Sequence, residues 1–93
     1  MSIEVLIDKY LRYADRVFKE MQKNPTEVTV TKEKLEEVLR WATDYLEDAK
    51  YYKAQGKLET SLTSIAYCEG LLEALRIIGA VKFEWPTNQE NKE

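Results

Sequence analysis

The 93-residue chain contains no histidine, which removes the side chain that most often acts as a general base near neutral pH. The serine and cysteine catalytic sets that depend on histidine, and most zinc sites, are thereby excluded. Glycine-rich phosphate loops and Cys-x-x-Cys pairs are absent from the sequence as well. We therefore expect a protein that is not an enzyme, with no catalytic residue, no cofactor and no metal ion.

Cysteine and long apolar runs are also scarce. The single cysteine, Cys68, cannot form a disulfide within the chain, which fits a reducing cytoplasm. No apolar run approaches the roughly 18 residues that a membrane helix needs, and no basic stretch precedes an apolar block near Met1. We expect a cytoplasmic protein without a secretory signal or a membrane partner.

The net charge of −3 lacks the basic excess that is typical of a nucleic-acid binder. It therefore argues against nucleic acid as a partner.

The apolar residues that are present recur at helical spacing in three segments. They predict helices over about residues 2–23, 32–55 and 58–78. Ser2 and Thr31 are suited to cap the first two helices, and Gly56 to end the second. Because the link at Gly56 is short, the last two helices should be antiparallel neighbours.

The predicted fold is all-α: an antiparallel three-helix bundle with a short extended C-terminal flap. Residues 1–86 form a single domain in this interpretation, since 44% apolar residues in a chain of this length suffice for one core. Val81, Phe83 and Trp85 alternate with charged residues, so the flap should lay these side chains on the bundle. Residues 87–93 are polar and are expected to form a disordered tail.

The third predicted helix has only a narrow polar strip, so we expect it to be enclosed on several sides. One side of this helix reads Thr63, Tyr67, Gly70 and Ala74, which are mostly small residues. Glycine inside a helix costs about 1 kcal/mol relative to alanine, so some gain should offset it. We predict that Gly70 lets another helix approach closely, from the same chain or from a second copy.

Aromatic residues at helical spacing suggest an interaction surface. Trp41, Tyr45 and Tyr52 share one flank of the second helix; such rows are most often the edge of a core, but aromatics are also enriched at interfaces. Our main hypothesis is a non-catalytic protein-interaction or self-association module, whose partner is another protein or, in a homo-oligomer, a second copy. Its candidate residues are Trp41, Tyr45, Tyr52, Tyr67, Gly70, Ala74, Phe83 and Trp85.

An acidic strip on the third helix supports an alternative. Glu69 and Glu73 are one turn apart, and Arg76 follows after a further turn. They could form a solvated strip with a Glu73–Arg76 ion pair. They could instead form, with Tyr67, a half-enclosed site for a small ligand or a cation. Two carboxylates supply few of the roughly six oxygen ligands that a hard cation takes.

Charged residues of one sign gather on each of the first two helices. The basic stripe of the first comprises Lys9, Arg12, Arg16, Lys19 and Lys23; the acidic ridge of the second comprises Glu33, Glu37, Asp44, Glu47 and Asp48. Either set is typical of a solvated face, and the two could attract each other within a chain or between copies. A weaker alternative is an accessory domain that contacts RNA or a nucleotide enzyme through the basic stripe.

The stretch "YYKAQGKLETSLTSIAYCEGLLEALRIIGAVKFEW", residues 51–85, resembles the archaeal domain of unknown function 357. The matching positions are Tyr51, Tyr52, Gly56, Ala66, Tyr67, Gly70, Leu71, Leu72, Glu73, Ala74 and Gly79. Two residues depart from the family pattern, Lys57 where an acid is expected and Glu73 where aspartate is expected. The first weakens the cap of the third helix. The resemblance implies an archaeal, cytosolic helical bundle and implies no activity.

Overall fold

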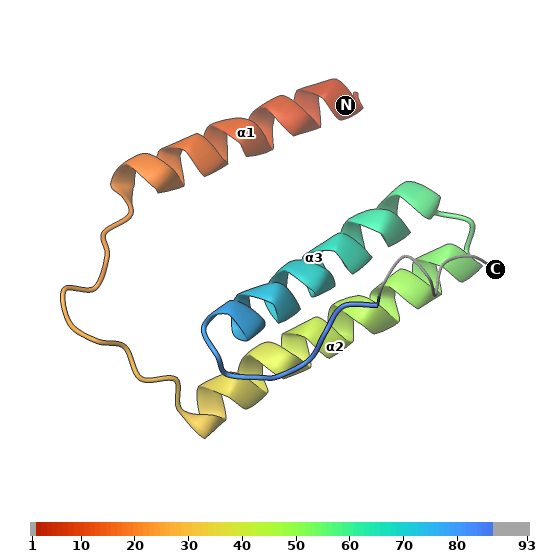
Figure 1. Ribbon diagram of the computed structural model, residues 1–93. Coiled ribbons are helices and arrows are strands. Elements are labelled where there is room, and N and C mark those ends of the chain that lie inside the picture. Colours follow the sequence, from red (N-terminus) through yellow and green to blue (C-terminus); the bar gives the residue numbers. More distant parts are fainter. Residues whose placement is uncertain (1, 87–93) are drawn as a thin grey trace.

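The computed structural model describes residues 2–86, and within them it contains three helices and no strand (Figure 1). They are α1 (Ile3–Glu20), α2 (Lys32–Ala54) and α3 (Leu58–Ile77). The predicted all-α class is confirmed. The bounds of α2 and α3 agree with the sequence prediction to within one residue, whereas α1 ends three residues early. Met21 already has extended dihedral angles, with φ −63° and ψ 136°.

The ends of the helices are fixed by local hydrogen bonds. The hydroxyl of Ser2 accepts from the amide of Val5, and that of Thr31 accepts from the amide of Lys34, each at 3.2 Å. Gly56 follows α2 with φ +77°, the left-handed conformation that favours glycine. The predicted caps are therefore present. Lys57 gives α3 no side-chain cap, as expected where an acid is missing.

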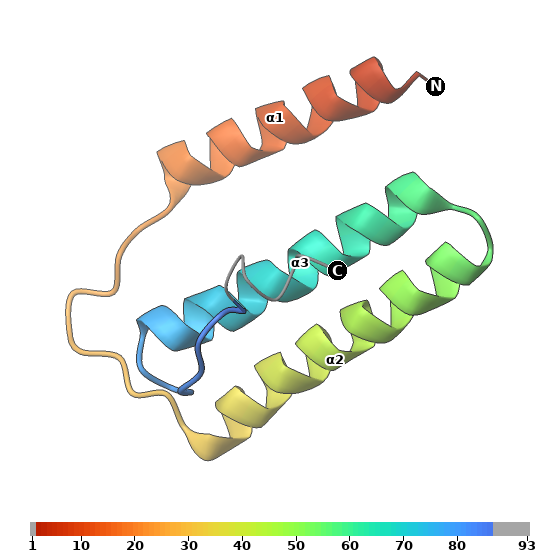
Figure 2. The same cartoon turned by 45° about the vertical axis from the view of Figure 1, so that its right-hand side comes forward.

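Helices α2 and α3 form an antiparallel hairpin (Figure 2), and most of the residues buried in it have small side chains. The buried residues are Ala42 and Ala49 of α2 and Cys68 and Leu75 of α3, together with Ser64. The hydroxyl of Ser61 donates to the carbonyl oxygen of Ala49 at 2.7 Å, which ties the two backbones together. Within residues 2–86 no large side chain is fully buried, so the hairpin has a thin core.

Helix α1 stands apart from this hairpin (Figure 1, Figure 2). No Cα atom of α1 lies within 8 Å of a Cα atom of α2 or α3, and residues 21–31 run between α1 and α2 as a connector without a helix. The third member of the predicted bundle thus forms as a helix but does not pack on the other two. Amphipathic spacing determines that α1 is helical and which side is apolar, but not what that side contacts.

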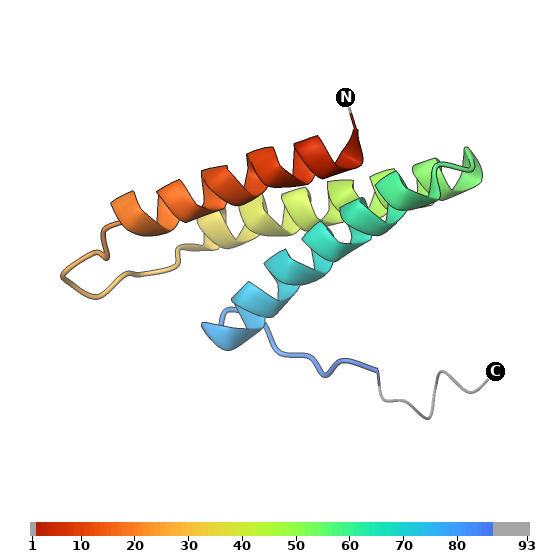
Figure 3. The same cartoon turned by 90° about the horizontal axis from the view of Figure 1, so that it is seen from above.

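The C-terminal flap follows a sharp turn at Gly79, where φ is +79°. The amide of Ala80 donates to the carbonyl oxygen of Leu75 at 2.9 Å, and residues 82–86 then run without regular structure along the hairpin. In Figure 3 the flap lies on the opposite side of the hairpin from α1. Val81 and Phe83 are half-buried, as the alternating pattern predicted. The predicted disordered tail, 87–93, lies outside the described residues.

Candidate interaction face

Three aromatic rings form a row across the open side of the hairpin. Trp41 and Tyr45 are one turn apart on α2 and stack with ring centroids 6.3 Å apart. Tyr45 stacks in turn on Tyr67 of α3, with centroids 4.3 Å apart and an angle of 28° between the ring planes. Trp41 is 52% exposed and Tyr67 51% exposed. This row, with Gly70 and Ala74 beside it on α3, is called the aromatic face below.

A small hollow opens beside the row. It has a volume of about 230 Å³ and is lined by Glu37, Val38, Trp41, Tyr67 and Leu71. Small-molecule sites are usually larger, about 300–1,000 Å³. The hollow is therefore suited to an apolar side chain of a partner rather than to a metabolite.

Gly70 lies on the outer side of α3. A Cβ atom added at this position would meet no atom within 4 Å, and both Gly70 and Ala74 are exposed. The prediction that Gly70 makes room for another helix of the same chain is wrong in this structure, because Cys68 and Leu75 are the buried residues on the side that meets α2. Close approach by a second copy stays a prediction.

Helix α3 is also more open than its composition predicted. Leu62 is 69% exposed and Ile77 is 68% exposed, since α3 packs on α2 along one side only. Although its polar strip is narrow, α3 is therefore not enclosed by the rest of its own chain. Part of its apolar surface has no partner within the chain.

The remaining predicted interaction residues lie elsewhere on the hairpin. Tyr52 is near the end of α2, where its ring packs edge to face with that of Tyr51. The two ring centroids are 5.4 Å apart. In the flap, the rings of Phe83 and Trp85 pack edge to face, with their centroids 4.9 Å apart. The predicted set is thus divided between the aromatic face, the end of α2 and the flap.

Glu73 links the flap to α3. Arg76 donates to both carboxylate oxygens of Glu73, at 2.7 and 2.8 Å, and the indole of Trp85 donates to one of them at 2.9 Å. The hydrogen bonds from Arg76 and then Trp85 lower the pKa of Glu73 to about 2, while the same pair raises the pKa of Arg76. The predicted Glu73–Arg76 ion pair is present, and it occupies the carboxylate.

The four predicted ligand residues do not form one cluster. Glu73 and Arg76 face each other, but Tyr67 stacks on Tyr45 in the aromatic row, and Glu69 is exposed. A hollow of about 520 Å³ beside the flap is lined by Arg76 but by none of the other three. Among residues 2–86, no group of three or more acidic or cysteine side chains could hold a metal ion.

Sequence reasoning missed two features of the surface. The Trp85–Glu73 hydrogen bond joins residues 12 positions apart across a turn, and no periodic pattern indicates such a pair. The predicted three-helix bundle would bury the apolar side of α1, which has no partner in this structure. No signal in the sequence indicates this, because the predicted connector, residues 24–31, has a length that is ordinary between helices of a bundle.

The basic stripe lies on α1 away from its apolar side, except for Lys23, which falls in the connector. The ammonium group of Lys9 lies 5.6 Å from the ring centroid of Tyr10 and 5.7 Å from that of Tyr13. Arg16 pairs with Glu20 at 3.0 Å. These contacts are all within α1, so the stripe has no partner on the hairpin.

A family model described as "Protein of unknown function (DUF357)" matches residues 9–81, which is most of the chain. The chain belongs to this family. The DUF357 match includes most of α1, all of α2 and α3, the aromatic face and Glu73, but ends before Phe83 and Trp85. No curated protein and no solved structure matches the chain. No helix within residues 2–86 has the length and apolar character to cross a membrane.

Proposed function

We propose that this protein is a non-catalytic self-association module and that the aromatic face is its binding surface. The observation that carries the proposal is this exposed row of stacked rings, which has no partner in its own chain. Tryptophan and tyrosine are enriched among the residues that contribute most to binding free energy. The archaeal origin and the cytoplasmic location expected from the sequence belong to the same proposal.

The exposed area of the chain supports the proposal of self-association. The accessible surface is 8651 Å², whereas a compact monomer of 10.9 kDa exposes about 5,600 Å². If the residues outside 2–86 exposed their full unfolded surface, about 2,000 Å² of excess would still belong to the described residues. A standard interface buries about 800 Å² on each partner, so the excess is large enough for a stable one.

The shape of the chain also supports the proposal of self-association. The radius of gyration is 16.4 Å, against about 12 Å for a compact domain of 93 residues. The extended arrangement follows from α1, which forms without joining the hairpin. A chain with two separate apolar surfaces gains free energy by covering them, and a second copy supplies complementary surfaces of both kinds.

The alternatives from the sequence have less support. The carboxylate of Glu73 is engaged by Arg76 and Trp85, which leaves Glu69 without the partner that a cation site would require. The basic stripe is interrupted by acidic residues, and α1 carries four acidic and four basic side chains. Self-association therefore uses more of the observed surface than a ligand site or an RNA contact does.

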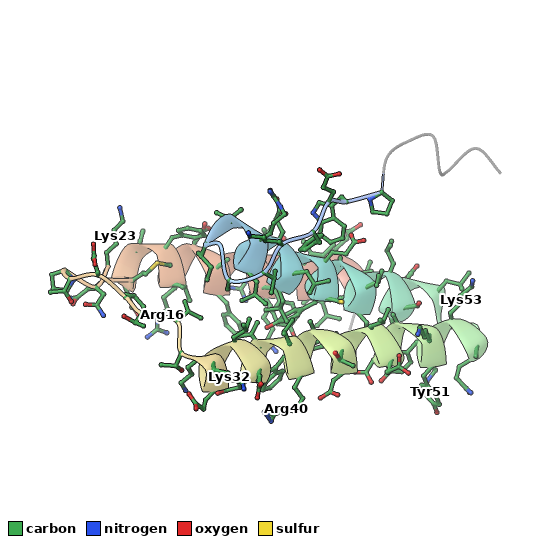
Figure 4. The ribbon with its side chains drawn as sticks, turned by 60° about the horizontal axis from the view of Figure 1, so that its bottom comes forward. Arg16, Lys23, Lys32, Arg40, Tyr51 and Lys53 are labelled. Atoms are coloured by element: carbon green, nitrogen blue, oxygen red, sulfur yellow. The ribbon has the colours of Figure 1, made fainter. Side chains whose placement is uncertain are left out.

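The first test is the molar mass in solution, by size exclusion with light scattering over a range of concentrations. We expect a dimer of about twice 10.9 kDa that dissociates on dilution. Trp41→Glu should shift the equilibrium to monomer. Tyr51→Glu is the matched control, because Tyr51 is 59% exposed and projects from the outer side of α2 (Figure 4). A wild-type protein that is monomeric at every concentration would overturn the proposal.

A further inference from the structure

We propose that the aromatic face is covered by α1 of a second copy, and that the exchange is reciprocal. Each hairpin of the dimer then carries its partner's first helix. This inference rests on the proposed self-association and adds the identity and direction of the element that binds.

Helix α1 supplies one strongly apolar side that nothing covers. Its members include Ile3, Ile7, Tyr10, Val17 and Phe18, each at least 50% exposed, with Phe18 at 78%. At 100° per residue these side chains share one half of the helix, and Arg12 and Lys19 lie on the opposite half. Most of the stability of a helix in a protein comes from packing of its apolar side, so α1 needs a surface on which to pack.

The aromatic face offers a hollow between α2 and α3, and Ala74 beside Tyr67 presents little side chain there. Gly70 lies farther round α3, on its outer side, where a Cβ atom would meet nothing within 4 Å. A helix lying there could approach the α3 backbone closely. The hollow beside Trp41 and Tyr67 would then receive one of its apolar side chains.

Charge determines the direction in which α1 lies. The part of the acidic ridge formed by Glu37, Asp44 and Asp48 borders the aromatic row on α2, within a turn of Trp41 or Tyr45. If α1 packs antiparallel to α2 with its apolar side in the groove, helical rotation turns Glu4, Asp8 and Asp15 away from that ridge, and the basic stripe faces solvent. The reverse direction would bring Glu4, Asp8 and Asp15 toward it.

A second copy, rather than the chain's own hairpin, is the proposed partner because α1 has no contact with α2 or α3 of its own chain. The connector, residues 21–31, reaches about 36 Å when fully extended, which is long enough to carry α1 to a neighbouring copy. Each chain offers one apolar helix and one aromatic face, so two copies satisfy both surfaces in a closed, two-fold arrangement.

Disulfide trapping tests the exchange. We would place one cysteine at the centre of the apolar side, Ala14→Cys, and one on the aromatic face, either Gly70→Cys or Ala74→Cys in separate variants. After mild oxidation, a covalent dimer on a non-reducing gel is expected. Arg12→Cys with Ala74→Cys is the control, because Arg12 lies on the opposite side of α1. Cys68 can stay, since it is 4% exposed and burial raises the pKa of its thiol.

The outcomes separate this inference from the proposed function. An internally bonded monomer would show that α1 closes on its own hairpin, and the exchange would be wrong. A dimer by light scattering that forms no bond in either variant would also overturn the exchange while leaving self-association in place. A wild-type protein that is monomeric at all concentrations would overturn both the exchange and the proposed self-association. Equal trapping of the Arg12→Cys control would show that the bond reports collisions, and would count against the exchange.

Discussion

Glu73 is the residue that joins the flap to the hairpin, and its ionisation should control that contact. Its pKa is about 2 in the folded chain, against the usual 4.5, because Arg76 and Trp85 donate to the carboxylate. A lowered pKa means that the ionised group stabilises the fold above about pH 4.5. This contribution is lost as the pH falls from there toward 2.

We therefore expect the indole N–H resonance of Trp85 to shift between about pH 4.5 and 2, as measured by NMR. Glu73→Gln should remove this transition. Glu69→Gln, one turn away on the same helix, should leave it in place because Glu69 makes no hydrogen bond to the flap. A transition that persists unchanged in Glu73→Gln would show that another group holds Trp85.

Gly70 gives a second test at the scale of a single residue. In the isolated chain, Gly70→Ala should raise the free energy of unfolding by about 1 kcal/mol, because alanine favours the helix and its Cβ atom meets nothing. Denaturant unfolding at concentrations where the protein is monomeric measures this change. A decrease instead would contradict the open environment of Gly70.

The bulkier substitution Gly70→Leu should affect the monomer and the dimer differently. It should leave the monomer folded, since the position is exposed, but weaken the dimer by holding the partner's helix away from α3. Light scattering on dilution would give the dissociation constant. An unchanged constant would mean that no helix approaches Gly70.

At the scale of the elements, α1 should depend on association for its structure. It contributes 18 helical residues beside 23 in α2 and 20 in α3. Because α1 has no contact with the hairpin of its own chain, dilution below the dissociation constant should lower the helical circular dichroism signal by up to roughly 30%. A signal that stays constant while the mass halves would show that α1 is stable alone or closes on its own hairpin.

The elements themselves could largely be predicted from the sequence, since local interactions determine them. Ser2 and Thr31 cap their helices through the next turn, and Gly56 ends α2 by its own backbone conformation. The stacking of Trp41 on Tyr45 follows from a separation of one turn. These features need no knowledge of the rest of the chain.

The arrangement of the elements could not be predicted in the same way. The apolar side of α1 is equally suited to its own hairpin, to a second copy or to another protein, because burial of apolar area is not directional. The spacing of Gly70 predicts close approach by a helix of the same chain or of a second copy, but it does not fix the rotation of α3, which turns Gly70 outward. The Trp85–Glu73 bond depends on the turn at Gly79, which brings distant residues together.

For the whole molecule, mass and size together distinguish three arrangements. An open monomer has the observed radius of gyration of 16.4 Å, a closed monomer would have about 12 Å, and a compact dimer of two chains about 16 Å. Small-angle scattering alone would not separate the first from the third, whereas light scattering does. We expect about twice 10.9 kDa together with about 16 Å. A mass of one chain with about 12 Å would indicate a closed monomer.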